Sequence, residues 1–172
     1  MNKNVILYGL IAGFIASVGI ASMAFGGTID FENSMLVAYA SMLLAFSLIF
    51  VAVKKQRDAQ GGAITFGKAF VTGLYITLIA STIYVATWLV CYYFFIPDFM
   101  DQYAEFSLSQ LRAEGASEAA IAAKQQEMEV FREFYKNPFF NILMTYTEIL
   151  PIGLLLSLIS AAVLKKKPQQ LN

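Results

Sequence analysis

The sequence predicts an all-helical membrane protein, a bundle of four transmembrane helices with a helical hairpin between the third and the fourth. Four apolar stretches support this prediction, and together they contain one acidic and no basic residue: residues 5–25, 34–53, 69–96 and 139–164. Each has the roughly 20 residues that a helix needs to cross about 30 Å of hydrocarbon. Only 14% of the chain is charged, against about 25% in an ordinary soluble domain. We therefore expect residues 1–172 to form one integral membrane domain.

The residue types that the chain lacks exclude several classes of function. Cys91 is the only cysteine and there is no histidine, which removes disulfide frameworks, Cys or His metal sites and imidazole catalysis. The formal net charge is zero, whereas nucleic-acid binding needs a basic face. We expect no enzymatic activity, no metal, no cofactor and no nucleic-acid partner. The lipid bilayer is the first partner that the composition predicts.

The first span shares two features with a secretory signal peptide. Lys3 precedes an apolar run, and residues 22–24 offer a small-x-small cleavage site. The run of about 20 residues is longer than the 7 to 15 of a signal core. We therefore interpret residues 5–25 as a retained helix.

Small residues recur every four positions along this first span, at Gly9, Gly13, Ser17 and Ala21. In lipid, such a ridge lets two helix backbones approach closely, because apolar burial gives helices little drive to associate there. The spacing predicts a packing ridge that faces another helix of the bundle. The alternative is a homodimer face.

The second and third spans are joined by a basic connection, residues 54–62, which ends in the turn signal Gly61-Gly62. With four crossings, eight of the twelve basic residues lie on one side of the membrane: Lys3, Lys54, Lys55, Arg57, Lys68, Lys165, Lys166 and Lys167. The positive-inside rule then places both termini in the cytoplasm.

Gly62, Gly67 and Lys68 have the G-x-x-x-x-G-K spacing of a phosphate-binding loop. That motif requires a Ser or Thr at the next position and a strand before it. Ala69 follows Lys68, and a charged turn after a membrane helix precedes the motif. We expect Lys68 to extend toward lipid headgroups instead.

Residues 98–136 differ in composition from the spans and predict an external helical hairpin. They carry eight acidic and four basic residues. Asp98 follows Pro97 and is expected to cap the first arm, Gly115 to end it, and Ser117 to cap the second arm. Asn137 and Pro138 end the hairpin.

Each arm of the hairpin has an apolar stripe at helical spacing. In the first arm Phe99, Tyr103, Phe106 and Gln110 follow this spacing, with Leu111 beside them, and in the second the stripe is Ile121, Met128, Phe131 and Tyr135. We expect these stripes to pack on each other or to rest on the outer membrane surface. Docking of another protein is the alternative, because two helices are too few to enclose a core.

Glu148 is the one charged residue inside a span. It lies about nine residues into the fourth span, which is roughly 14 Å deep at 1.5 Å per residue. A charge at the bilayer centre costs on the order of 2.5 to 3.5 kcal/mol on insertion scales. Asn141 and Thr145 precede it by seven and three residues, which places the three side chains on one helix face. Pro151, three residues further on, favours a kink.

A matching polar row follows the third span at Thr77, Ser81, Tyr84 and Trp88. Tyr84 and Ser41, in the second span, fall near the depth of Glu148. We predict a polar seam along the bundle axis, formed by Glu148, Thr145, Asn141, Tyr84, Ser81 and Ser41. Within it, Tyr84 or Ser41 is expected to form a hydrogen bond with the Glu148 carboxyl group.

The seam has a structural and a functional interpretation. As a structural element, a neutral carboxylic acid fixes helix register, at about 0.6 kcal/mol per interhelical hydrogen bond. As a functional element, Glu148 carries protons in a small membrane transporter. A transmembrane peptidase or transferase is disfavoured, because no second carboxylate and no nucleophile with a His or Lys base occurs at that depth.

Three segments resemble a known family. These are GGAITFGKAF at residues 61–70, FYKNPFF at residues 134–140 and EILPIGLLLSLISA at residues 148–161. They are similar to an uncharacterised bacterial inner-membrane family, the domain of unknown function number 4199. The similarity extends to Pro97-Asp98-Phe99 and Gly115-Ala116-Ser117. It implies a four-helix protein of the bacterial inner membrane with a periplasmic hairpin, and it implies no activity.

The sequence therefore favours a non-enzymatic accessory or scaffold protein. The hairpin at residues 98–136 and the ridge of small residues would meet protein partners, including a second copy of the chain. The alternative is a small proton-coupled transporter in which Glu148 is the proton-carrying carboxylate.

Overall fold

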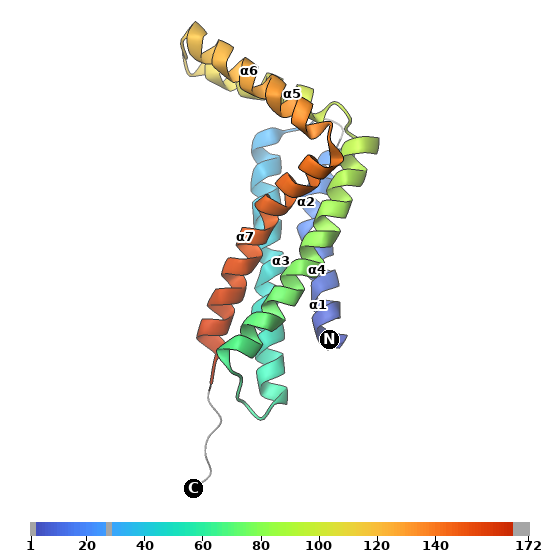
Figure 1. The fold of residues 1–172 in the computed structure, drawn as a ribbon, viewed down its shortest axis with the longest axis vertical. Helices are drawn as coiled ribbons and strands as arrows, with labels where there is room; N and C mark the ends of the chain where they lie inside the picture. Colours follow the sequence, from blue (N-terminus) through green and yellow to red (C-terminus); the bar gives the residue numbers. More distant parts are fainter. Residues whose placement is uncertain (1–2, 27–28, 167–172) are drawn as a thin grey trace.

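The chain forms a bundle of four long helical segments, and a two-helix hairpin lies across one end of it (Figure 1). The computed structural model describes residues 3–26 and 29–166, and these contain helices and no strand. The helices are α1 (Lys3–Ala16), α2 (Val18–Phe25), α3 (Phe31–Ala59), α4 (Phe66–Phe94), α5 (Phe99–Ala113), α6 (Glu118–Tyr135) and α7 (Pro138–Leu164). We call the end that carries α5 and α6 the hairpin side, and the end where α1 starts and α7 ends the terminal side.

Four segments are long and apolar enough to cross a membrane, as predicted: Lys3–Phe25, Phe31–Ala59, Phe66–Phe94 and Pro138–Leu164. Only 33 to 44% of the apolar window in each segment is buried inside the molecule. Large apolar side chains are exposed on every span, among them Leu7, Phe14, Leu36, Leu44, Val71, Leu78, Leu155 and Val163. A surface this apolar requires hydrocarbon around it, so the fold is that of a multi-pass membrane protein.

The first span has a local irregularity that separates α1 from α2 at Ser17. The Ser17 hydroxyl donates a hydrogen bond to the Gly13 carbonyl at 2.8 Å, a local bond that competes with regular helix geometry. The backbone ladder continues across this point, from Ser17 N to Gly13 O at 3.1 Å and from Ala21 N to Ser17 O at 3.0 Å. The two helices therefore act as one crossing.

Polar side chains cap the starts of four helices. The side chains of Asp30, Thr65 and Ser117 each accept a hydrogen bond from the backbone amide three residues later. The side chain of Asn137 accepts one from the backbone amide of Phe139. The backbone and side-chain amides of Asn33 hold the pKa of Asp30 below its usual value. Asp98 stands at the N-cap position of α5 as predicted, but its carboxylate accepts from the Gln102 side chain at 2.8 Å and caps no backbone amide.

The basic connection between the second and third spans is shorter than predicted. Residues 54–59 continue α3 as helix, because Lys, Gln, Arg and Ala are good helix formers and the exposed last turn can bond to water. Gly61 and Gly62 then reverse the chain with φ of 76° and 83°. The Lys and Arg residues assigned to one side lie at the terminal side (Figure 1), except Lys167, which lies outside the described residues.

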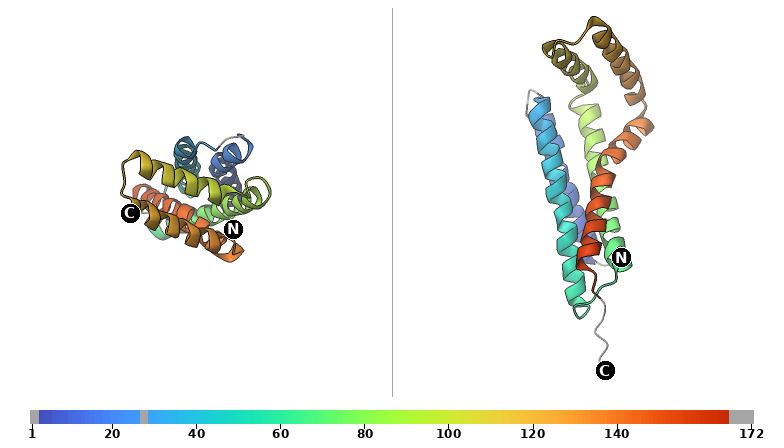
Figure 2. Two further views of the ribbon diagram at one scale, coloured as in Figure 1. Left: turned by 90° about the horizontal axis from the view of Figure 1, so that it is seen from above. Right: turned by 90° about the vertical axis from the view of Figure 1, so that its left-hand side faces the viewer.

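The arrangement of the spans places α4 against α1 on one side and α7 on the other, with α3 against α1 and α7. On the terminal side the helices pack tightly through glycines. A Cβ atom built on Gly73 would lie 2.8 Å from Ser157 Cβ, and one built on Gly153 would lie 2.9 Å from Phe46 Cζ. Toward the hairpin side, α7 diverges from α3 (Figure 1 and the right view of Figure 2).

This packing predicts that Gly153→Ala destabilises the bundle, although alanine is the better helix former. The added methyl group would meet Thr77 and Phe46 at less than 3 Å, and overpacking of a core typically costs about 1–3 kcal/mol. Gly67→Ala is the matched control, because nothing lies within 4 Å of a Cβ at Gly67. Unfolding in mixed micelles should show a lower free energy for G153A and no loss for G67A. Equal stability of the two variants would contradict the tight contact.

Candidate functional site

The hairpin packs on the bundle through an aromatic cluster around Phe31, the first residue of α3. The Phe31 ring lies 5.0 Å from that of Phe106 and 5.7 Å from those of Phe99 and Tyr103, measured between centroids. Only 6% of Phe31 is exposed. The apolar stripe of α5 therefore rests on the bundle itself, a contact that the sequence did not predict.

The two arms of the hairpin are joined by an ion pair across their polar sides. Arg132 of α6 pairs with Asp101 of α5 and with Glu129 of its own helix. Seen from above in the left view of Figure 2, the arms run side by side across the end of the bundle. They form a cover over the space that opens where α7 leaves α3.

A cavity of about 380 Å³ lies beneath this cover. Its walls come from α2, the first turns of α3, the last turns of α4, both hairpin arms and α7. The lining residues are Gly19, Ile20, Met23, Phe31, Ser34, Met35, Ala38, Tyr39, Tyr84, Trp88, Phe99, Met100, Tyr103, Phe131, Tyr135, Met144, Thr145, Thr147 and Glu148. The volume lies within the 300–1,000 Å³ of ordinary small-molecule sites.

The lining of the cavity is aromatic and rich in methionine, with a single ionisable acid. Among the described lining residues, Glu148 is the only one with a carboxyl, ammonium or guanidinium group. Methionine side chains adapt to irregular shapes, and aromatic rings bind both apolar groups and cations. The cavity is therefore suited to a molecule that is mostly apolar and has a polar end.

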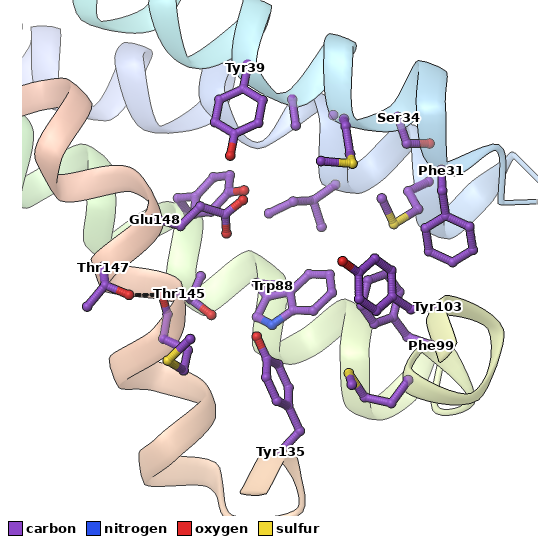
Figure 3. A pocket seen from close by; sticks show the side chains of 18 of the residues that line it. Phe31, Ser34, Tyr39, Trp88, Phe99, Tyr103, Tyr135, Thr145, Thr147 and Glu148 are labelled. Carbon is purple, nitrogen blue, oxygen red and sulfur yellow. Dashed lines mark hydrogen bonds between the residues drawn. The ribbon is translucent and has the colours of Figure 1, made fainter. Parts of the chain in front are cut away.

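Glu148 lies at the wall of the cavity and is exposed to it. Figure 3 shows Tyr39 of α3 pointing across toward Glu148 of α7. Within residues 3–26 and 29–166, no hydrogen bond or ion pair involves the Glu148 carboxyl group. Burial and, next, the nearby Glu148 charge raise the pKa of Tyr135, in α6, to about 12, so that hydroxyl stays protonated at neutral pH.

The predicted hydrogen bond from Ser41 or Tyr84 to Glu148 is absent from the part of the chain that the structure describes. The Ser41 hydroxyl bonds to backbone carbonyls instead, Ala38 at 2.8 Å and Ala16 at 3.2 Å. Ser41 lies two residues beyond Tyr39, or about 200° around the helix, and so faces α1. Tyr84 does line the cavity together with Glu148, and only 4% of it is exposed.

The buried face of α7 explains why Glu148 is exposed to the cavity while Asn141 and Thr145, its predicted neighbours on the same helix, are buried. Asn141, Thr145, Ile149 and Gly153 are buried at successive steps of four residues. Glu148 is displaced by one residue, about 100°, from Ile149 in this row. Its side chain therefore lies at the edge of the helix contact and points into the open space toward α3.

Asn141 and Thr145 form a separate polar group with Trp88. The Trp88 Nε1–H donates to Asn141 Oδ1 at 2.8 Å, and the Thr145 hydroxyl donates to the Asn141 carbonyl at 2.8 Å. Ser81 Oγ and Asn141 Nδ2 are buried without a hydrogen-bond partner among the described residues. The predicted seam is thus not one continuous chain of hydrogen bonds.

A further interhelical hydrogen bond lies on the terminal side, where it had not been predicted. Thr77 Oγ1 and Ser157 Oγ are 3.2 Å apart, and both side chains are fully buried. It sits beside Gly73 and Gly153, which allow α4 and α7 to approach each other. The small residues at 73, 153 and 157 were the available signal in the sequence.

The ridge of small residues faces its own bundle at its first two positions. A Cβ atom at Gly9 would lie 2.8 Å from Ile79 Cβ, and one at Gly13 would lie 2.8 Å from Ile83 Cβ, both on α4. Ser17 is buried and Ala21 is partly buried. Gly19, outside the ridge, makes the close approach of α2 to α3, with a built Cβ 2.9 Å from Ala38 Cα.

The G-x-x-x-x-G-K spacing at Gly62, Gly67 and Lys68 does not form a phosphate-binding loop. Thr65 caps α4 by accepting from the Lys68 amide at 3.3 Å, and Gly67 lies in the first helical turn. Several residues of the cavity escaped the sequence reasoning, among them Phe31 and Tyr39. A tyrosine between two alanines inside an apolar span was the only signal for Tyr39.

The fold and the cavity define an all-helical, multi-pass membrane protein with a covered pocket at one end of its bundle. Residues 7–166 match the family described as "Protein of unknown function (DUF4199)". The match covers most of the chain, so the chain belongs to this family, in agreement with the resemblance noted from its sequence. No curated protein and no solved structure matches the chain.

The Phe31 cluster predicts that Phe31→Ala loosens the hairpin while the bundle stays folded. Loss of a buried phenylalanine side chain removes about 1.5–3 kcal/mol of burial free energy. This corresponds to a roughly 10- to 150-fold larger population of the opened hairpin. Amide hydrogen exchange in α5 should accelerate by that factor, with exchange in α4 and α7 unchanged. Phe50→Ala, a change on the lipid-exposed face of the same helix, should leave α5 exchange as it was. Unchanged exchange in F31A would show that the cluster does not hold the hairpin down.

Proposed function

We propose that this protein is a non-enzymatic membrane protein that binds an amphipathic molecule in the cavity beneath its hairpin. The observation that supports this most directly is the composition of the cavity wall. Aromatic and methionine side chains surround a single carboxyl group, that of Glu148, which has no hydrogen bond or ion pair among the described residues. An apolar wall with one polar group is how proteins hold and orient a small ligand.

The distribution of packing supports entry of the ligand from the hairpin half of the bundle. Among the lining residues of α3, Met35 is 49% exposed and Tyr39 is 45% exposed. On the terminal side, Phe46, Ile49 and Ile76 are fully buried and fill the space between the helices. A molecule dissolved in the bilayer can thus reach the pocket from the side where α7 diverges from α3.

A non-enzymatic role is supported by the residues that line the cavity. Covalent or acid–base catalysis requires a nucleophile, a base, or a pair of carboxylates in mutual reach. The described lining residues include one carboxyl group and no cysteine, lysine or arginine. The hydroxyl groups of Thr145 and Thr147 bond to backbone carbonyls at 2.8 and 2.7 Å.

For the orientation, we propose a bacterial inner-membrane protein with both termini in the cytoplasm and the hairpin in the periplasm. The support is the positive-inside rule, applied to the basic residues at the end of α3, the start of α4 and the end of α7. In this orientation the cavity would receive molecules from the outer half of the membrane.

An accessory role with a protein partner would use the outward side of the hairpin, because the aromatic side of α5 is occupied by Phe31. That outward side is rich in exposed acids, such as Glu105, Glu114 and Glu118. The homodimer alternative for the small-residue ridge loses support at Gly9 and Gly13, which contact α4 of the same chain.

A proton-coupled transporter is the second candidate, and the position of Glu148 in an accessible cavity favours it. Transport would also require an opening on the terminal side, where the Thr77–Ser157 contact and the glycine packing close the bundle. The discriminating measurement is substrate-driven proton movement in liposomes. Its loss in a folded Glu148→Gln variant would establish transport, and its absence in the wild-type protein would leave binding as the function.

The binding function predicts that a bromine-labelled amphiphile quenches the fluorescence of Trp88. Trp88 is the only tryptophan and it lines the cavity, so quenching by contact reports occupancy. The probe is an alkyl maltoside brominated in its chain, exchanged into micelles of the unbrominated detergent. Ser34→Phe places a ring at the cavity wall and should reduce the quenching at least threefold.

Ser47→Phe is the matched control, because Ser47 is an exposed residue on the same helix outside the cavity. The brominated maltoside should quench Trp88 of this variant to the same extent as Trp88 of the wild-type protein. If Trp88 is not quenched in the wild-type protein, or if the two phenylalanine variants behave alike, the cavity does not bind amphiphiles and the proposal is wrong.

A further inference from the structure

We infer that the cavity selects an amphipathic cation, with a protonated or quaternary amine beside Glu148 and an apolar body against the aromatic and methionine walls. This inference rests on the proposed function and adds the chemical class of the ligand. It requires that the site contain an uncompensated negative charge, surfaces that favour a positive charge, and a volume that fits an amine with part of its apolar chain.

The group that can supply this charge is the Glu148 carboxyl group, which has no hydrogen-bond or ion-pair partner among the described residues. A basic side chain of the hairpin, Arg132, could in principle neutralise this group. It forms ion pairs with Asp101 and Glu129 instead, on the polar side of the hairpin. Arg132 does not line the cavity. A lone carboxylate inside a membrane bundle normally has a cationic or hydrogen-bonding partner. Since the described residues supply none, a cationic ligand is the partner that the site lacks.

The surfaces that favour a positive charge are the aromatic rings around Glu148. Tyr39 points toward Glu148 from α3, and Trp88 occupies the α4 wall of the same space (Figure 3). Tyr84 and Tyr135 line the same cavity as Glu148. Ring faces attract ammonium groups by about 0.5–2 kcal/mol each, most strongly when water is excluded.

The size and shape of the site fit an amine with a chain. A cavity of about 380 Å³ is at the lower end of the range for small-molecule sites. It has room for an alkylammonium head and part of a chain. Met35 and Met144 line the cavity on α3 and α7, the two helices that diverge there, and they provide an apolar contact for a chain that continues into the bilayer.

Two sources supply this chemistry, a diacyl lipid with an ethanolamine or choline headgroup and a free single-chain alkylammonium compound. Both present an amine at the end of an apolar body. The lipid also carries a phosphate, for which the described cavity wall offers no lysine or arginine. The experiment therefore includes one arm for each source.

The test uses Trp88 fluorescence in uncharged maltoside micelles at 0.15 M salt, where the Debye length is about 8 Å. The probe is an alkyltrimethylammonium brominated in its chain, compared with the brominated maltoside and with a brominated alkyl sulfate of equal length. The cation should quench Trp88 saturably at a mole fraction at least tenfold lower than the maltoside. The sulfate should quench no better than the maltoside.

Glu148→Gln should abolish this preference for the cation, while quenching by the brominated maltoside persists and shows that the pocket is formed. Glu148→Asp keeps the charge and should keep the preference. Glu32→Gln is the matched control: it makes the same chemical change on the hairpin side of α3, at a residue that does not line the cavity. It should bind the cation like the wild-type protein.

The lipid arm replaces the cation by phosphatidylethanolamine or phosphatidylglycerol with brominated chains. Quenching by the ethanolamine lipid with the same dependence on Glu148 identifies a lipid, and quenching by the alkylammonium alone identifies a free amphiphile. Quenching by maltoside with no added preference for either amine overturns the inference and leaves the binding function intact. Absence of quenching by every probe removes both.

Discussion

The close approach of α4 and α7 on the terminal side is the constraint on which the rest of the structure depends. Gly73 and Gly153 remove the side chains that would hold these helices apart, and Thr77 meets Ser157 in the gap. In lipid this contact must rely on fit and on hydrogen bonding, because apolar burial between helices gains little there. A bundle closed at one end by such contacts can open at the other.

The opening on the hairpin side and its cover are consequences of that arrangement. As α7 diverges from α3, the first turns of α3 lose a neighbour, and the hairpin covers the rings exposed there. Phe31 is central to this contact, since three rings of α5 surround it, and Trp88 of α4 adds a contact with Phe99. The hairpin, which in sequence looked like an independent arm, is thus the roof of a cavity.

The role of Glu148 changes with this geometry. On a helix drawn from the sequence alone, the acid shares a face with Asn141 and Thr145 and looks like part of a hydrogen-bonded core. In the bundle, those two residues pair with each other and with Trp88, while Glu148 lies one residue off the buried row and faces the cavity. Glu148 therefore makes no hydrogen bond between helices in the described structure, which supports the proposed role as a ligand contact.

By itself, the sequence determined the solvent and the local structure: four apolar spans, the polar hairpin, the glycine turns and most of the caps. These features depend on composition and on contacts between residues that are close in the chain, and the spacing of residue types in the sequence reports both. The end of α3 and the capping hydrogen bond of Asp98 were misread, because helix propensity and a competing glutamine outweighed the expected signals. Only the tertiary structure decided that Phe31 anchors the hairpin, that Tyr39 and not Ser41 faces Glu148, and that a cavity exists. Those outcomes depend on the rotation of each helix and on where two helices separate, and neither quantity is encoded in the pattern of a single segment.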